Sequence, residues 1–369
     1  LISPSDMSYA FESYISGAGR AIKKTVNTVA GFTSNEPAPL DEYPFISRFY
    51  REKDAEEVGA GLPLWLPNGT VIREELEAWA KETERKAGYQ RVATPHITKA
   101  QLYKISGHLP YFAEDMFPPL EMDGEKYYLK PMNCPHHHMI YKSRARSYRD
   151  LPLRLTEYGQ LYRYERSGTL HGLFRTRGFC QNDAHIYVAE KNVIDEFVRI
   201  MDMHRYYYEK LGVRNFKVKL GLRDPKNLRK KYHGDDAMWK KAERLTRIGL
   251  EKSGVEYAEE IGGAAHYGPK GDIIIESVIG KEYAKGTIQI DLYMPDRFDL
   301  SFTNEKSKKE RPVVIHRAPL GSHERMVGFL TEHFGGAFPV WLAPVQATVL
   351  PVGEKFEAYG KKVFEALET

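Results

Sequence analysis

The stretch that decides the fold covers residues 174–187 and reads FRTRGFCQNDAHIY. In a strand, successive side chains point to opposite faces. The even-numbered face is small and mostly apolar, whereas the odd-numbered face is charged, hydrogen-bonding or aromatic: Arg175, Arg177, Phe179, Gln181, Asp183 and His185. A solvated outer face would also be polar, but such faces are usually rich in Lys, Glu and Thr. The alternation therefore predicts a strand with one buried face and one face that binds a ligand.

Further strand-like runs surround this stretch, at residues 154–165, 214–222, 272–279, 286–293 and 312–318. Several are joined by short turns, as at Gly280-Lys281, and strands joined in this way are antiparallel. Apolar residues recur at helical spacing in residues 72–87 and 194–211, and each run stops before a glycine. The pattern predicts an α+β fold in which helices flank a large antiparallel sheet and pack on one of its faces.

Composition excludes several classes of protein. The chain has 369 residues, with 54 Lys and Arg against 50 Asp and Glu, so its net charge is +4. No run approaches the roughly 18 apolar residues of a membrane span, and the N-terminus reads as no secretory signal. The two cysteines, Cys134 and Cys180, cannot form a disulfide framework and suit a reducing compartment. We therefore expect a globular, cytoplasmic protein with no membrane partner.

Changes in composition along the chain predict three parts. Residues 1–41 are poor in apolar side chains and end in the linker-like Ser34-Asn35-Glu36-Pro37-Ala38-Pro39. Residues 42–338 contain the α+β pattern. Residues 339–369 begin a new unit, in which residues 347–352 read as a buried strand and residues 354–367 as a helix.

The polar strand faces predict a nucleotide triphosphate site. Arg163 and Glu165 share a face near a hairpin tip, and Thr287, Gln289 and Asp291 form the polar face of another strand. The planar fork of arginine bonds two phosphate oxygens at once, and an aromatic ring beside it can stack on a base. There is no GxxxxGK[ST] loop, no GxGxxG after a strand, no GxSxG and no HExxH. Spacing alone does not group the scattered cysteine and histidines into a metal site, and an isolated one is more often structural.

Eight segments resemble threonyl-tRNA synthetases, a family of class II aminoacyl-tRNA synthetases. They follow one another in the family's order from about residue 42 onward: residues 130–135, 162–165, 170–179, 181–185, 267–270, 314–318, 321–325 and 341–346. The resemblance implies threonine–tRNA ligase activity, in which ATP activates threonine to threonyl-adenylate before its transfer to tRNA(Thr). It also implies a catalytic domain over 42–338, the incomplete start of an anticodon-binding α/β domain over 339–369, and a homodimer formed through motif 1 around Pro95.

The resemblance assigns a zinc ion to each subunit, held by Cys134, His185 and His316. One thiolate and two imidazoles leave a coordination position open, as in catalytic zinc sites. In the family that position takes the amino and hydroxyl groups of threonine, which excludes valine because valine has no hydroxyl. Asp183 matches the acceptor for that hydroxyl, and further residues match the amino-acid pocket: Met132, Gln181, Tyr267 and Ser322.

The remaining site residues match positions that serve ATP, with its Mg²⁺, and the later transfer to tRNA. Arg163 matches the motif 2 arginine on the α-phosphate, Lys270 lies near the carboxylate and α-phosphate, and His108 is implicated in transfer. The other matches are Glu165 to the adenine amino group, Phe179 and Arg325 to the adenine ring, Arg175 to the γ-phosphate, and Gln289 to the nucleotide site.

Some features depart from the family pattern. Ala284-Lys285 replaces a Gln and a small residue, so we expect Lys285 to enter the pocket, where it pairs with Asp183 or a phosphate, or to lean to the rim. Asn182 replaces a more usual Asp, with little expected consequence. No editing module is expected before the catalytic domain, so serine should escape correction in cis. A regulatory paralogue that binds amino acids without charging tRNA, and a seryl or prolyl enzyme, are the alternative interpretations.

Overall fold

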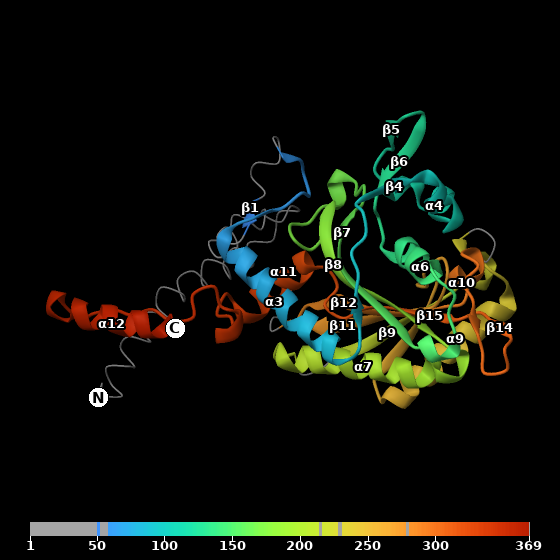
Figure 1. Ribbon diagram of the computed structural model, residues 1–369. Coiled ribbons are helices and arrows are strands. Elements are labelled where there is room, and N and C mark those ends of the chain that lie inside the picture. Colours follow the sequence, from blue (N-terminus) through green and yellow to red (C-terminus); the bar gives the residue numbers. More distant parts are fainter. Residues whose placement is uncertain (1–49, 52–57, 214–215, 228–230, 278–279, 369) are drawn as a thin grey trace.

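An eight-stranded sheet forms the centre of the protein (Figure 1). The computed structural model describes residues 50–51, 58–213, 216–227, 231–277 and 280–368, so the predicted extension 1–41 lies outside the described residues. The strands, in spatial order, are β10 (Tyr257–Ile261), β9 (Phe216–Leu222), β11 (Lys270–Glu276), β12 (Glu282–Asp291), β15 (Val313–Ala318), β8 (Gly178–Val188), β7 (Leu153–Tyr162) and β3 (Gln90–Arg91).

The predicted α+β class is confirmed, with one refinement at the edges of the sheet. The strands from β9 to β7 pair antiparallel, and the short connection predicted at Gly280-Lys281 joins β11 to β12. The edge pairs β10–β9 and β3–β7 are parallel. Parallel neighbours need a crossover connection, and the chain between β9 and β10 contains the helix α9.

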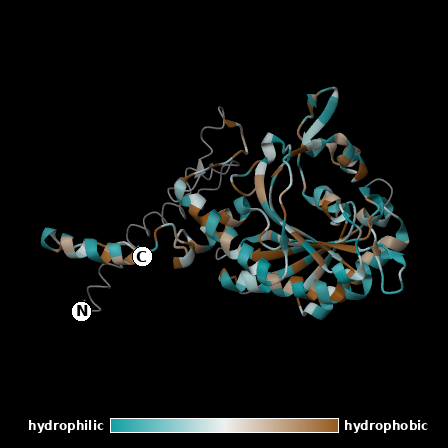
Figure 2. Cartoon of the chain, in the orientation of Figure 1, coloured by the Kyte–Doolittle hydropathy of each residue, from teal (hydrophilic) through white to brown (hydrophobic). Residues whose placement is uncertain are grey.

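Helices cover one face of the sheet and bury the main hydrophobic core against it. They are α3 (Pro67–Lys86), α7 (Val193–Lys210), α9 (Asp236–Ser253) and α11 (His323–Phe334). Figure 2 shows hydrophobic residues gathered where helices meet the sheet and hydrophilic residues facing outward. The helices α7 and α9 approach closely at Gly249, where an added Cβ would lie 2.5 Å from Cδ1 of Phe197. Helix–helix packing therefore requires a glycine at this position.

The opposite face is only partly covered. The helices α6 (Cys134–Lys142) and α10 (Met294–Arg297) pack there, and a second core joins Tyr141 and Met294 to Leu155, Tyr187 and Val314 of the sheet. The rest of this face stays open and floors the pocket described below. The covered part was not foreseen from the sequence, which placed the helices on a single face.

Smaller elements surround the sheet. Two strand pairs are β1 (Tyr50–Arg51) with β2 (Leu64–Trp65), and β13 (Phe302–Thr303) with β14 (Lys309–Glu310). A three-stranded sheet has the order β4 (Ile97–Lys99), β6 (Glu125–Leu129) and β5 (Leu120–Met122). The remaining helices are α4 (Ala100–Ile105), α5 (His108–Tyr111) and α12 (Glu357–Leu367). Among the described helices, none has the length and apolar character needed to cross a bilayer.

Two strand predictions were wrong. The strand predicted at residues 174–187 is β8, which begins at Gly178. Residues 171–177 instead form a tight turn, in which Arg175 N–H donates to the His171 carbonyl. The apolar run 347–352 forms no strand, and its Leu350 and Val352 are exposed. A strand needs a neighbour to pair with, and no described strand pairs with this run. The helix predicted after it is confirmed as α12.

Candidate functional site

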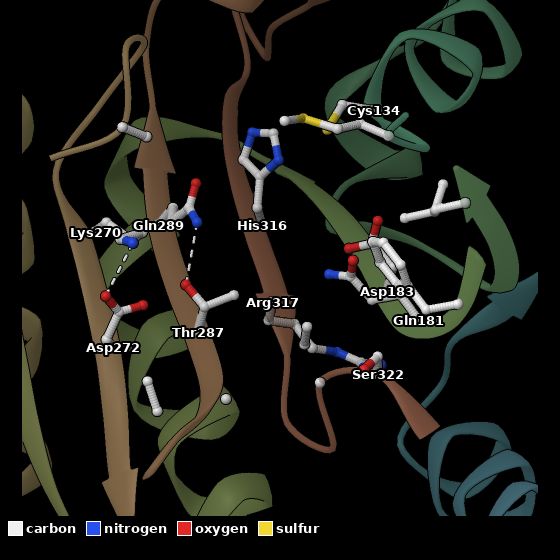
Figure 3. Close-up of a pocket in the computed structure, with 18 of the residues that line it drawn as sticks. Cys134, Gln181, Asp183, Lys270, Asp272, Thr287, Gln289, His316, Arg317 and Ser322 are labelled. Atoms are coloured by element: carbon white, nitrogen blue, oxygen red, sulfur yellow. Dashed lines mark hydrogen bonds and ion pairs between the residues drawn. The ribbon is translucent and has the colours of Figure 1, made fainter. Parts of the chain in front are cut away.

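One pocket on the open face of the sheet brings most of the predicted site residues together. Its walls come from β7, β8, β11, β12, β15 and the turn before α11, and Figure 3 shows the labelled side chains around it. The predicted residues that line it are Met132, Cys134, Arg163, Glu165, Phe179, Gln181, Asp183, Tyr267, Lys270, Gln289, His316, Ser322 and Arg325. The other three, His108, Arg175 and His185, contact members of this set.

Strand register explains how distant residues meet. His185 on β8 lies opposite His316 on β15, His316 lies opposite Gln289 on β12, and Gln289 lies opposite Lys270 on β11. Paired residues on neighbouring strands point to the same face. One row across the sheet therefore carries two imidazoles, an amide and an amino group into the pocket.

A thiol and two imidazoles converge at one end of this row. Ligand atoms of Cys134, His185 and His316 all lie within 4.8 Å of one another, and all three residues are buried. Cys134 is the first residue of α6, and Figure 3 shows it near the His316 ring. One sulfur and two nitrogens are the donor set of a zinc site with an open position.

Each imidazole of this cluster is oriented by a second residue through one nitrogen. Nδ1 of His185 lies 2.8 Å from Nδ1 of His137, whose Nε2 lies 3.1 Å from Oε2 of Glu157. Nε2 of His316 lies 2.9 Å from Oδ2 of Asp291. The second nitrogen of His185, Nε2, is buried and has no hydrogen-bond partner among the residues that the structure describes. Metal-binding histidines typically show this arrangement, so the residues present fit a zinc ion.

Glu157 is the anchor behind the histidines. It accepts hydrogen bonds from the backbone and hydroxyl of Thr94 and from Nζ of Lys130, 3.2 Å away. Burial raises its pKa, but the hydrogen bond from His137, the charge of Lys130 and the Thr94 amide lower the pKa of Glu157 to about 2. A permanent carboxylate therefore fixes His137 and, through it, His185. The sequence prediction missed this residue.

The predicted amino-acid pocket lies beside the cluster. Oδ2 of Asp183 accepts a hydrogen bond of 3.0 Å from Nδ2 of Asn133. The Asn133 side chain crosses β7 at Gly159, where an added Cβ would lie 2.2 Å from its Oδ1. The hydroxyl of Tyr267 donates to Gln289, and burial raises the pKa of Tyr267 well above 10, so its hydroxyl keeps its proton. Asn133 belongs to a quoted family segment, but its role depends on a glycine far away in the sequence.

Arginines dominate the other end of the pocket. The Arg163 guanidinium lies 5.1 Å from the centroid of the Phe179 ring, and burial lowers the pKa of Arg163. Nε of Arg325 donates to the Phe174 carbonyl at 2.7 Å. Arg175 pairs with Glu165 at 2.9 Å. Although Arg175 does not lie on the strand as predicted, its turn still places it beside the pocket, and the arginine-rich end suits a polyphosphate.

Lys270 and Lys285 meet different partners. Nζ of Lys270 pairs with Asp272 at 2.9 Å across the pocket floor. Nζ of Lys285 donates to the Arg325 carbonyl at 2.6 Å, and Lys285 lines the pocket. Of the three expected placements for Lys285, the pair with Asp183 does not form, because the amino group turns toward α11.

His108 lies at the edge of the pocket as a neutral imidazole. Burial, His266 and Arg163 lower its pKa to about 3. Nε2 of His108 lies 3.1 Å from Sδ of Met132, and a thioether sulfur can only accept, so Nε2 is the donor. Nδ1 then has the lone pair and accepts from the Ser106 hydroxyl at 2.7 Å. The neutral ring therefore presents its N–H to Met132, which lines the pocket.

Residues 117–334 match the family described as tRNA synthetase class II core domain (G, H, P, S and T). The threonine–tRNA ligases of Chlorobium limicola and Chlorobaculum tepidum are each 50% identical over 316 residues, which is 84% of this chain and 48% of theirs. The chain thus spans about half the length of these curated relatives.

Solved structures give the same picture. A crystal structure titled as the RNA binding domain of threonyl-tRNA synthetase from Cryptosporidium parvum Iowa II superposes with a TM-score of 0.82 at 36% identity, covering 88% of this chain and 80% of that one. A putative threonyl-tRNA synthetase from Aeropyrum pernix gives 0.74 at 34%, covering 84% and 70%. Giardia lamblia prolyl-tRNA synthetase, at 15% identity and a TM-score of 0.64, shares the fold.

Proposed function

We propose that this chain, which belongs to the class II tRNA synthetase core-domain family, is the catalytic part of a threonine–tRNA ligase. The observation that carries the proposal is the convergence of Cys134, His185 and His316 beside Asp183 in an arginine-rich pocket. A site for a small hydroxylated amino acid then adjoins a site for ATP and its Mg²⁺. The relatives named as threonine–tRNA ligases support the same activity.

In the first step, a carboxylate oxygen of threonine attacks the α-phosphorus of ATP, and the bond to pyrophosphate breaks. Arg163 would bind the α-phosphate, where its buried guanidinium stabilises the charge that develops during attack. Phe179 and Arg325 would hold the adenine, with Glu165, Arg175 and Gln289 around the nucleotide. Lys270 would approach the reacting carboxylate and phosphate.

Amino-acid selection would depend on the ion held by Cys134, His185 and His316. A zinc ion held there would supply a Lewis acid toward the amino and hydroxyl groups of threonine. Asp183 would accept the hydroxyl proton, fixed in place by Asn133, while Gln181, Tyr267, Met132 and Ser322 shape the pocket. Valine has no hydroxyl, so it would leave the ion without its oxygen ligand and Asp183 without a hydrogen-bond donor. Serine offers the same two groups, so we expect this catalytic unit to form seryl-tRNA as well.

In the second step, a terminal ribose hydroxyl of tRNA(Thr) attacks the carbonyl carbon of the adenylate and AMP leaves. His108, a neutral imidazole that contacts Met132 at the edge of the pocket, would assist this transfer. We also propose that residues 42–338 form the catalytic domain and that residues 339–369 begin an anticodon-binding domain. The protein would be a cytoplasmic homodimer formed through the segment around Pro95, which is exposed in the described chain.

Amino-acid-dependent exchange of pyrophosphate into ATP tests the proposal. Zinc-replete protein should exchange with threonine, more weakly with serine, and not with valine or proline. Binding of threonine without exchange would instead indicate the regulatory paralogue, which binds amino acids without charging tRNA. Exchange driven by proline or by serine alone would identify a different member of the class.

A further inference from the structure

Lys285 is a buried lysine that contacts the start of α11 at two points. Its side chain is 5% exposed, and its Nζ donates to the Arg325 carbonyl at 2.6 Å. Its own carbonyl lies against Gly321, where an added Cβ would come within 2.2 Å of the Lys285 oxygen. Gly321 has a φ of +60°, a conformation that favours glycine. The lysine therefore contacts both ends of the turn that carries Ser322 and Arg325.

Three aromatic rings surround the same Nζ. Their centroids lie at 4.6 Å for Phe174, 4.8 Å for Tyr283 and 5.3 Å for Phe329. The rings of Phe174 and Tyr283 are stacked, 5.0 Å apart with an interplanar angle of 13°. Burial and the neighbouring Arg325 lower the pKa of Lys285, whereas ring faces stabilise its charged form. Phe174 belongs to the tight turn of residues 171–177, so the cage joins this turn to β12 and α11.

The elements that Lys285 joins are those that carry the proposed nucleotide contacts. Arg325 donates from Nε to the Phe174 carbonyl. The next residue, Arg175, pairs with Glu165. One continuous set of contacts thus runs from Lys285 through Arg325 and the Phe174 turn to Glu165. Through its one side-chain nitrogen, Lys285 contacts both the Phe174 ring and the Arg325 carbonyl.

We propose that Lys285 is a positioning residue for nucleotide binding: it holds the Phe174–Arg175 turn and the first turn of α11 in the geometry that receives ATP. This inference rests on the proposed function, because it assumes that Arg325 and Arg175 bind ATP. A buried lysine is costly in an apolar site, and a hydrophobic side chain of similar length would fill the cage at less cost. Lys285 makes its hydrogen bond to the backbone of an ATP-site residue, which an apolar side chain cannot do.

Two variants in the full-length protein separate positioning from simple packing. Lys285→Met keeps the length of the side chain and its contacts with the rings but removes the donor. Lys281→Met is the matched control, since Nζ of Lys281 also lies over Phe174 and Tyr283, at 5.9 and 5.1 Å, but Lys281 is exposed. The measurements are KM for ATP and for threonine in the exchange assay, the Kd for ATP alone, and amide hydrogen exchange in residues 174–177 and 321–326.

We expect Lys285→Met to raise KM and Kd for ATP roughly tenfold, which corresponds to about 1.4 kcal/mol of binding free energy, and to speed amide exchange in both turns. KM for threonine should stay within about twofold in this variant, and ATP binding should do so in Lys281→Met. An unchanged Kd for ATP in Lys285→Met, or equal losses for ATP and threonine, would overturn the proposal.

The two hypotheses fail in different ways. If the unchanged protein shows no threonine-dependent exchange, the proposed function fails, while the Kd for ATP still tests Lys285. If Lys285→Met does not fold, Phe174→Leu takes its place, because it removes one ring of the cage and leaves the carbonyl that Arg325 binds. It should weaken ATP binding roughly threefold, and unchanged binding would count against the positioning role.

Discussion

Replacing Glu84 by Gln should destabilise the protein by about 3–5 kcal/mol, the usual cost of leaving one partner of a buried ion pair uncompensated. Glu84 on α3 and Arg317 on β15 are both fully buried, and their Oε1 and NH1 atoms lie 2.8 Å apart. Among the described residues, Glu84 is the carboxylate that pairs with Arg317. Burial lowers the pKa of Arg317, but Glu84 and nearby tyrosines outweigh it, so the pKa is raised and the guanidinium stays charged.

The neighbours of the pair limit how far the cost can be reduced. Asn182 donates from Nδ2 to Oε1 of Glu84 at 2.8 Å, and Thr156 donates to Oε2 at 3.0 Å. A Gln keeps these contacts only if its NH₂ group faces Thr156, whose hydroxyl would then have to donate to the Asp183 carbonyl, 3.1 Å away, and the negative charge beside Arg317 is lost in either case. The Tyr89 ring, 4.3 Å from the guanidinium, offers partial compensation.

Urea unfolding followed by circular dichroism measures the effect. Glu82→Gln on the same helix is the matched control, because Glu82 pairs with Arg85 on the surface and such pairs contribute about 0–1 kcal/mol. Adding Asn182→Asp to Glu84→Gln returns a carboxylate to Arg317, since Oδ1 of Asn182 already lies 3.4 Å from NH1, and should restore much of the loss. A cost similar to that of Glu82→Gln, or no recovery with Asn182→Asp, would refute the reasoning.

Three further outcomes test the site. Cys134→Ser should lower bound zinc from about one equivalent per chain to near zero and abolish exchange; retained zinc by metal analysis would contradict the ligand assignment. Arg163→Gln should lower the exchange rate roughly 10²-fold or more with little change in metal content, and a smaller loss would remove Arg163 from the reacting phosphate. Burial raises the pKa of Glu324 to about 7, so between its unfolded value of about 4.3 and that pKa the folded state binds more protons and the free energy of unfolding falls as pH rises. Glu324→Gln should remove this slope, and an unchanged slope in pH-dependent urea unfolding would exclude Glu324 as its source.

The alternation of side chains along a strand predicted which residues face the pocket. The alternation at residues 178–188 holds in the structure: Phe179, Gln181 and Asp183 line the pocket, while Cys180 and Asn182 pack toward the helices. Alternation does not show where a strand loses its partner. Residues 171–177 fold into a tight turn, and Arg177 N–H donates to the Gly61 carbonyl of a distant segment, so the strand begins later than predicted.

Contacts between distant segments could not be predicted from the sequence. Glu157 orients His137, and through it His185, only because β7 pairs with β8 in a register that the sequence does not state. Asn133 reaches Asp183 because Gly159 leaves space for it. Lys285 had an ambiguous direction, since parity places a residue on a face but does not fix where a flexible four-carbon side chain ends.

Adjacent residues of β15 connect the site to the helix layer. His316 points into the pocket toward Cys134, and Arg317 pairs with Glu84 of α3 on the other side of the sheet. Close-packed interiors transmit displacement, so a loss of the Arg317–Glu84 pair should reach the metal cluster through one peptide unit. The residues on β8 follow the same rule, because Asn182, which contacts Glu84, adjoins Asp183 in the amino-acid pocket. The buried ion pair is therefore placed where it would fix the strand positions on which the proposed zinc and threonine sites depend.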